Sequence, residues 1–262
     1  MMRGAPNLLA TIVAATRAAV ESRIRDLPLD PSSSSRRPDG EAFLEALTSS
    51  AQPRVIAECK RRSPSRGVLR QRYEPTAHAR AYEAAGAAAI SVLTEPTFFD
   101  GDASHLAAVR QAVTVPLLRK DFIVTGYQVH EAAMLGADAV LLIVGALEDP
   151  ELRTLHDLAV SRGLAVLMEV HDEVELQRAV DSGARIIGVN SRNLRTLEVD
   201  LAVTERLASR IPDEAVAVAE SGIRSAEDMR RLAEYGYDAF LVGERLIVEQ
   251  DPGAALRTLR ES

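Results

Sequence analysis

Short apolar runs alternate with longer amphipathic segments along most of the 262-residue chain, from Pro53 onward. The apolar runs are rich in β-branched residues and predict strands, whereas apolar residues at helical spacing predict the helices between them. The eight predicted strands cover residues 54–60, 88–94, 115–120, 138–144, 164–170, 185–190, 215–220 and 238–243. The helical segments between them include 75–86, 126–136, 148–163 and 225–236.

This regular alternation predicts the fold class. The strands are apolar along nearly their whole length, which is typical of a parallel sheet covered by helices. We therefore predict an α/β fold, a closed (βα)8 TIM barrel whose chemistry lies at the carboxyl ends of its strands. An open doubly wound sheet is the alternative, but it would usually need fewer strands, and no G-x-G-x-x-G sequence follows the first strand.

A helical extension, residues 1–52, is predicted ahead of a barrel catalytic domain over 53–262, the two forming one structural domain. Apolar residues recur at helical spacing over 7–26, a Pro/Ser-rich loop follows, and 40–50 predict a second short helix. Charged residues interrupt the first apolar segment, which argues against a signal peptide, and no apolar run approaches a membrane span. We expect a cytoplasmic protein that does not bind a membrane.

Composition narrows the function classes. Apolar residues make up 47% of the chain, enough for a large core, while the net charge of −7 and the lack of a long basic run argue against nucleic-acid binding. The single cysteine, Cys59, excludes an internal disulfide and a cysteine-based zinc cluster. No histidine spacing predicts a metal site, and His171 follows a strand but also fits a helix start. The histidines expected at the surface are His78, His105, His130 and His156.

Lysine occurs at only two positions, Lys60 and Lys120, and arginine supplies the rest of the 31 basic residues. Each lysine is the last residue of a predicted strand, where barrels carry their chemistry. Arginine stays protonated, whereas burial and neighbouring groups can lower the pKa of a lysine to roughly 7–8. We therefore interpret both lysines as functional. The alternative is that they are retained by chance in an arginine-rich sequence.

Strand alternation predicts which side chains join the lysines. If Lys60 faces the barrel interior, Glu58 does too, and Cys59 faces the helices. The odd-numbered strands contribute to shared layers of the interior, so their charges should meet at the mouth. An ion-pair network is the structural alternative, but buried ion pairs stabilise poorly compared with apolar packing, which favours acid–base chemistry. The expected ring of charges consists of Glu58, Lys60, Lys120, Glu169 and Glu220.

The strand ends also carry candidate binding groups. Asn190 ends the sixth strand and can orient a hydroxyl or carbonyl, while Arg192 just beyond is either a carboxylate clamp or a plain loop cation. Gly222 and Gly243 follow the seventh and eighth strands, each before a helix start, where barrels bind phosphate with backbone N–H groups. Ser221 adds a further donor.

Eight segments of the chain combine into a recognisable set, which in order is IAECKRRSPSRG, SVLTEPTFFDG, LLRKDFIV, ADAVLLIV, LMEVHDE, IGVNSRNLRTLEVD, VAESGI and FLVGERL. Together these motifs resemble the indole-3-glycerol phosphate synthase family over nearly the whole chain. This resemblance implies a carboxy-lyase of tryptophan biosynthesis that needs no metal or organic cofactor. The implied reaction is ring closure, decarboxylation and dehydration of 1-(2-carboxyphenylamino)-1-deoxy-D-ribulose 5-phosphate, giving indole-3-glycerol phosphate, CO₂ and water.

The resemblance also implies residue roles. Lys120 is expected to protonate the substrate carbonyl oxygen and Glu169 to act as its acid–base partner, with Glu58 and Lys60 as candidates for the dehydration. Asn190 is expected to orient substrate hydroxyls. The implied substrate-binding residues are Arg192, Ser63, Pro64, Ser65, Phe99, Phe122, Leu141, Glu220 and Ser221, and the implied phosphate-binding residues are Gly222, Gly243 and the backbone of Glu244. Many relatives have a small residue in place of Glu244, and no substrate contact is assigned to the first helix.

From the residues alone, two other functions stay open. One is a Schiff-base aldolase that uses Lys60 or Lys120 as its nucleophile. The other is a non-catalytic phosphate-binding barrel, which the set of charged residues at the mouth argues against. The only partner expected is a small sugar phosphate, and contacts with other tryptophan-pathway enzymes are not readable from the sequence.

Overall fold

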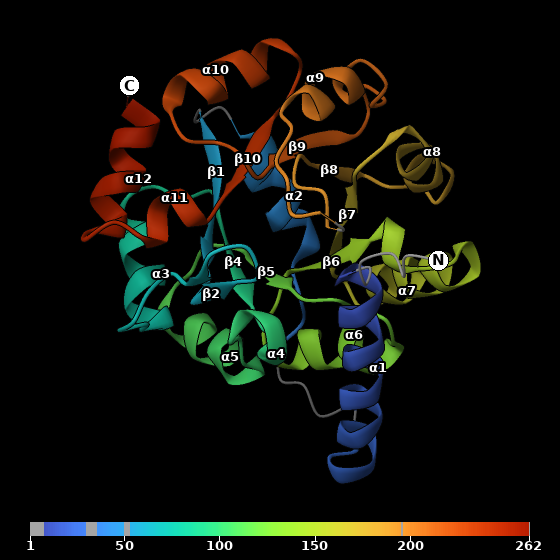
Figure 1. The fold of residues 1–262 in the computed structure, drawn as a ribbon. Helices are drawn as coiled ribbons and strands as arrows, with labels where there is room; N and C mark the ends of the chain where they lie inside the picture. Colours follow the sequence, from blue (N-terminus) through green and yellow to red (C-terminus); the bar gives the residue numbers. More distant parts are fainter. Residues whose placement is uncertain (1–7, 30–35, 50–52, 195, 262) are drawn as a thin grey trace, which may run out of the picture.

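The strands form a closed parallel barrel in the computed structural model, which describes residues 8–29, 36–49, 53–194 and 196–261 (Figure 1). The first strand, β1, pairs with both the last strand and β4, which closes the ring. The predicted (βα)8 barrel is therefore confirmed, and the open-sheet alternative is wrong. The barrel strands are β1 (Arg54–Cys59), β4 (Ala89–Leu93), β5 (Leu117–Lys120), β6 (Ala139–Ile143), β7 (Ala165–Val170), β8 (Ile186–Asn190), β9 (Val216–Glu220) and β10 (Ala239–Val242).

Helices surround the barrel and connect its strands (Figure 1). They are α3 (Pro75–Ala84), α4 (Pro96–Phe99), α5 (Ala103–Ala112), α6 (Gly126–Met134), α7 (Asp149–Ser161), α8 (Glu173–Asp181), α9 (Ala202–Ala208), α10 (Ala226–Glu234), α11 (Glu244–Ile247) and α12 (Pro252–Glu261), with a 3₁₀ turn η1 (Val144–Ala146). A small antiparallel hairpin, β2 (Arg62–Ser63) with β3 (Gly67–Val68), follows β1. Lys60 thus lies one residue beyond the end of β1, whereas Lys120 ends β5 as predicted.

Alternating side chains divide the apolar core into two clusters. One lies between the strands and the helices and includes Cys59, so the predicted outward orientation of this thiol is confirmed. The other fills the barrel interior with residues such as Ile56, Leu118 and Leu167. Because successive residues of a strand face opposite sides, each strand supplies both clusters.

Two helices precede the barrel, α1 (Leu8–Asp26) and α2 (Gly40–Thr48), and residue 7 of the predicted first helix lies outside the described residues. Phe43 and Leu47 of α2 are fully buried within the inner cluster, which places α2 against one end of the barrel. Gly40 permits this close contact, because a Cβ there would lie 2.4 Å from the backbone nitrogen of Ala165. In Figure 1, α1 runs beside α6.

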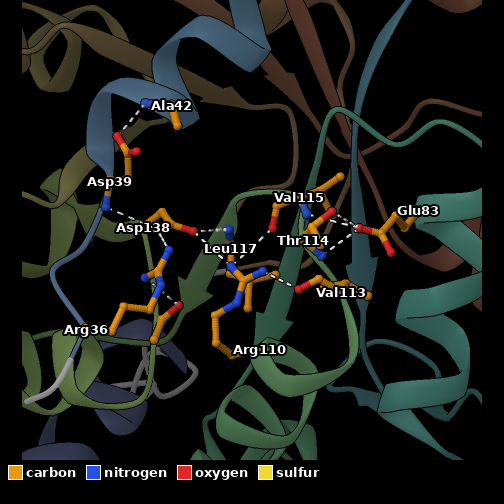
Figure 2. Close-up of polar contacts among 11 residues, drawn as sticks. Arg36, Asp39, Ala42, Glu83, Arg110, Val113, Thr114, Val115, Leu117 and Asp138 are labelled. Carbon is orange, nitrogen blue, oxygen red and sulfur yellow. Dashed lines mark hydrogen bonds and ion pairs between the residues drawn. The ribbon is translucent and has the colours of Figure 1, made fainter.

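A buried carboxylate, Asp138, joins the chain ahead of α2 to the barrel (Figure 2). It lies just before β6 and accepts hydrogen bonds from Arg36 Nη2 at 2.5 Å and from the backbone nitrogen of Asp39 at 3.1 Å. Its second oxygen accepts from Arg110 Nη1 at 3.2 Å and from the backbone nitrogen of Leu117 at 3.0 Å. Four donors therefore compensate the burial of this charge.

Candidate active site

A cavity of about 770 Å³ opens at the carboxyl ends of the strands. Each residue predicted for the site lines it, although these positions come from separate strands and loops. They are Glu58, Lys60, Ser63, Pro64, Ser65, Phe99, Lys120, Phe122, Leu141, Glu169, Asn190, Arg192, Glu220, Ser221, Gly222, Gly243 and Glu244. A cavity of this size accommodates a molecule as large as a substituted sugar phosphate.

The five charged residues of the predicted ring form two sets of ion pairs in the cavity wall. Lys120 Nζ lies 2.8 Å from Glu169 Oε2 and 3.0 Å from Glu220 Oε2, so β5, β7 and β9 meet at one ammonium. Lys60 Nζ lies 2.6 Å from Glu58 Oε1. The side chains of Glu169 and Glu220 are each 2% exposed, so a reacting molecule would meet these carboxylates with little competing water.

The neighbours of Lys120 in sequence hold it in position. Arg119, on the opposite face of β5, is fully buried and donates to Asp121 Oδ2 at 2.9 Å. It also lies 2.7 Å from Glu131 and donates to Thr94 Oγ1 at 3.1 Å. Asp121 Oδ1 in turn accepts the backbone N–H of Phe122. This anchoring of the strand end outside the barrel directs Lys120 inward.

The surrounding charges set the protonation of the cluster. Burial lowers the pKa of Lys120, but Glu169, Glu220 and Glu58 outweigh it, so its pKa is raised and the ammonium form is favoured. The expectation that surroundings lower this lysine's pKa is therefore wrong, because carboxylates reach its nitrogen on two sides. Burial raises the pKa of Glu220 to about 7, with the Glu169 charge adding to the effect and Lys120 opposing it.

Glu169 differs from Glu220 in its neighbours. Burial raises its pKa, but Lys120, His171 and a hydrogen bond from Asn190 outweigh burial, so its pKa is lowered. The Asn190 side chain is also held by its own loop, since Oδ1 accepts the backbone N–H of Arg192 at 2.9 Å. Two carboxylates with oppositely shifted pKa values, both bonded to one ammonium, form an acid–base set.

Gly188 in β8 makes room for Glu220, because a Cβ there would lie 2.2 Å from Glu220 Oε1. We expect Gly188→Ala to displace this carboxylate and to lower kcat about 10²-fold, the cost of moving a positioned group in an active site by about 1 Å. Gly183→Ala is a control for lost stability, because its φ of 78° strains an alanine while its Cβ would meet nothing within 4 Å, and kcat of its folded fraction should be unchanged. Steady-state assays at matched folded fractions check this, and wild-type kcat in Gly188→Ala would contradict it.

Aromatic and aliphatic side chains form one part of the cavity wall. The rings of Phe99 and Phe122 lie with centroids 6.0 Å apart, and Leu141 completes this side. Glu95 positions Phe99, because its carboxylate accepts the backbone N–H groups at the start of α4, including that of Phe99 at 3.1 Å. Leu8 and Ile12 of α1 also line the cavity, a contribution that the sequence reasoning did not assign to the first helix.

The predicted phosphate-binding residues line the cavity just beyond the ends of β9 and β10. Ser221 and Gly222 adopt positive φ angles of 66° and 74°, which turn the backbone sharply after β9. Gly243 precedes α11 and lies against Glu58, since a Cβ there would approach Glu58 Oε1 to 2.5 Å. Backbone N–H groups at such turns and helix starts suit an anion.

Glu244 turns its carboxylate toward arginines. It accepts a hydrogen bond from Arg66 Nη1 at 2.7 Å and lies 3.8 Å from Arg192 Nη2. Arg192 also donates to the carbonyl of Leu197 and to Ser65 Oγ. Arg66 and Arg192 therefore compensate the negative charge of Glu244. The backbone N–H of Glu244, and not its side chain, is the group suited to phosphate.

The histidines differ from expectation at two positions. His78 is buried and stacks on Tyr73 with ring centroids 5.5 Å apart, so its predicted surface position is wrong. His171 contacts Glu169, with Nε2 lying 3.5 Å from Oε1, although no role was predicted for it. Its place directly after the strand of Glu169 is the signal that could have identified it. Among the described residues, no group of three or more His, Cys, Asp or Glu is arranged to hold a metal ion.

Comparison with known proteins places these features in a family. The family profile described as indole-3-glycerol phosphate synthase matches residues 9–259. The chain belongs to the indole-3-glycerol phosphate synthase family. The synthase of Chromobacterium violaceum is 45% identical over 97% of both chains, and that of Nocardioides sp. is 55% identical over 78% of this chain and 79% of its own.

Solved structures support the fold alone. Thiamine phosphate pyrophosphorylase from Pyrococcus furiosus has a TM-score of 0.62 at 17% identity, covering 83% of this chain and 96% of its own. Distant barrels therefore share the architecture of the synthase family with little of its sequence. No helix in the described ranges is both long and apolar enough to cross a membrane.

Proposed function

We infer that this chain catalyses the reaction of its family, the conversion of 1-(2-carboxyphenylamino)-1-deoxy-D-ribulose 5-phosphate to indole-3-glycerol phosphate, CO₂ and water. The observation that carries this inference beyond the family match is the Lys120–Glu169–Glu220 cluster at the base of a cavity with one aromatic wall. The reaction needs a proton donor and a base beside an aromatic ring, and the cavity provides both.

Lys120 is proposed to act first. Its ammonium, favoured by the surrounding carboxylates, can donate a proton to the ribulose carbonyl oxygen while the ring carbon attacks the carbonyl carbon. The same charge stabilises negative charge that develops on this oxygen. The ring-closed product then loses its carboxylate as CO₂. Phe99 and Phe122 would hold the aromatic ring during this step.

The dehydration needs a second proton donor and then a base. The hydroxyl formed at ring closure leaves as water and needs a proton to do so. The Lys60–Glu58 pair is proposed to donate this proton. Glu169 is proposed to remove the final proton that makes the indole aromatic, since its lowered pKa keeps it ionised. Asn190 would orient substrate hydroxyls, and backbone groups at Gly222, Gly243 and Glu244 would bind the phosphate.

The protonation of Lys120 also bears on the Schiff-base alternative. An amine attacks a carbonyl carbon only when it is neutral. Glu169 and Glu220 hold Lys120 as an ammonium at 2.8 and 3.0 Å, which suits proton donation instead of imine formation. Borohydride should therefore trap no covalent adduct with the substrate.

The test of the function is the appearance of indole fluorescence when purified protein is mixed with the carboxyphenylamino sugar phosphate. We expect multiple turnovers without added metal or cofactor, inhibited by excess phosphate. Absence of indole product from folded protein would contradict the function. A cytoplasmic location and the lack of nucleic-acid or membrane partners stay predictions of the sequence.

Arg192 is proposed to bind the carboxylate that leaves. Arg192→Ala should weaken substrate binding about 10- to 100-fold, since hydrogen bonds to charged groups contribute about 1.5–3 kcal/mol. An analogue without the carboxylate should bind the variant and the wild type equally. Calorimetric titration of both ligands checks this. If the analogue loses as much affinity as the substrate, Arg192 does not bind the carboxylate.

A further inference from the structure

Glu244 directly follows the loop residue after β10 and carries a carboxylate at the cavity, where the substrate brings two anionic groups. These groups are a phosphate and the carboxylate that leaves as CO₂. Like charges repel one another, so the side chain of Glu244 should lower the affinity of the cavity for anions. The contacts of its two oxygens indicate what this carboxylate does.

The two carboxylate oxygens of Glu244 have different partners. Oε1 accepts a hydrogen bond from Arg66 Nη1 at 2.7 Å, which ties Glu244 to the turn of the β2–β3 hairpin. Oε2 lies 3.8 Å from Arg192 Nη2, which is within ion-pair distance but too far for a hydrogen bond. One oxygen is therefore anchored, and the other is only loosely paired.

Arg192 is held from its other side. Its Nη1 donates to the carbonyl of Leu197 at 3.2 Å and to Ser65 Oγ at 3.4 Å, and its backbone N–H donates to Asn190 Oδ1 at 2.9 Å. These contacts orient the guanidinium and leave Nη2 to face Glu244. An arginine hydrogen-bonds a well-placed carboxylate at about 2.7–2.9 Å. A substrate carboxylate can therefore replace the looser contact with Glu244.

We propose that Glu244 is a placeholder carboxylate for Arg192. It pairs with Nη2 while the cavity holds no substrate carboxylate, yields this nitrogen when the substrate binds, and pairs with it again after the carboxylate has left as CO₂. Its other oxygen stays on Arg66 throughout. The placeholder rests on the proposed function, because it requires Arg192 to bind a carboxylate that leaves during the reaction.

Such a placeholder makes Arg192 selective among anions. A ligand must compete with Glu244 to reach Nη2, and a repulsive group of this kind discriminates against ligands that bind weakly. The substrate can compete because its phosphate and its aromatic ring bind other parts of the cavity at the same time. A small carboxylate without those groups has no such support. Glu244 is thus a specificity-determining residue.

The test uses Glu244→Gln, which keeps the size of the side chain and removes its charge. Two ligands are titrated by calorimetry. One is the substrate with its carbonyl reduced to a hydroxyl, which cannot cyclise, and the other is the same molecule without its carboxylate. Both carry the phosphate, so direct repulsion between Glu244 and the phosphate affects them equally. We expect the carboxylate ligand to gain about threefold to tenfold more affinity than the carboxylate-free ligand, the range between an exposed ion pair and a charged hydrogen bond.

Arg192→Ala shows whether this gain has the proposed cause. In that background, Glu244→Gln should change the affinity of both ligands equally, because no arginine remains to be released. Glu173→Gln is the matched control for a lost charge, since Glu173 pairs with Arg206 at 3.3 Å on the outer helices. It should bind both ligands like the wild type. Glu244→Ser removes the same charge with a shorter side chain and serves if Glu244→Gln folds poorly.

Two results would overturn the placeholder. One is a carboxylate ligand that gains no more affinity from Glu244→Gln than the carboxylate-free ligand does. The other is a carboxylate-specific gain that persists in the Arg192→Ala background, which would show that Glu244 acts on the substrate without Arg192. Neither result bears on indole formation by the wild-type protein. Failure of the proposed function would instead appear as missing indole product from the wild type, so the two failures are distinguishable.

Discussion

Lys120→Arg is expected to lose kcat by about 10²- to 10⁴-fold while the protein stays folded, the usual contribution of a positioned proton donor. The compact Lys120 ammonium meets two carboxylates at 2.8 and 3.0 Å. A planar guanidinium keeps the charge but spreads it over a larger fork and gives up a proton far less readily. The enzyme would thus retain electrostatic attraction for the substrate and lose proton transfer.

Steady-state kinetics and thermal unfolding together check this expectation. The unfolding midpoint of Lys120→Arg should remain near that of the wild type, because the cation still compensates two buried carboxylates. Lys120→Met provides the contrast, since it leaves Glu169 and Glu220 without that cation and should lower both activity and stability. Near-normal turnover by a folded Lys120→Arg variant would show that the lysine proton is not needed.

Asp138→Ala is expected to give the largest loss of stability, about 3–5 kcal/mol in the free energy of unfolding, as for other broken buried ion pairs. The carboxylate is 2% exposed and compensates both Arg36 and Arg110 (Figure 2). Its loss would leave Arg110 without its acidic partner at the base of the barrel and would free the chain ahead of α2 from β6. The active-site groups lie at the other ends of the strands, so kcat of the folded fraction should hold.

Denaturant unfolding followed by circular dichroism measures this loss. The matched control is Glu41→Ala. Glu41 lies on the same N-terminal segment, and its exposed carboxylate pairs with Arg185 of the barrel. Exposed pairs contribute little, so the control should unfold with the wild-type midpoint. If Asp138→Ala unfolds like the control, Asp138 does not join the N-terminal segment to the barrel in the way its contacts indicate.

Much of the barrel is predictable from the sequence. The alternation of side chains along a strand and the position where a strand ends both depend on neighbouring residues in the chain. Alternation along β1 correctly placed Glu58 inward and Cys59 outward, and the strand ends gathered the predicted site residues around one cavity. Lys60 lies one residue beyond its strand because the short β2–β3 hairpin follows at once. Such errors at element boundaries do not move a residue away from the barrel mouth.

The properties that sequence reasoning missed depend on contacts between distant segments. The raised pKa of Lys120 requires knowing that Glu169 and Glu220 both reach its nitrogen, and sequence spacing does not give those distances. His171 is the exception, since the two carboxylates that it contacts, Glu169 and Glu175, lie only two and four residues away along the chain. Leu8 and Ile12, by contrast, reach the cavity only because α1 folds back against the barrel.

A single turnover of Glu169→Gln separates the ring closure proposed for Lys120 from the final deprotonation proposed for Glu169. Substrate labelled with ¹³C in the carboxylate allows CO₂ release and indole fluorescence to be followed together. In the wild type the two signals should rise at similar rates. In Glu169→Gln, CO₂ release should precede an indole signal that is slowed about 10²-fold or more. Indole formation at the wild-type rate by the folded variant would contradict the assigned role of Glu169.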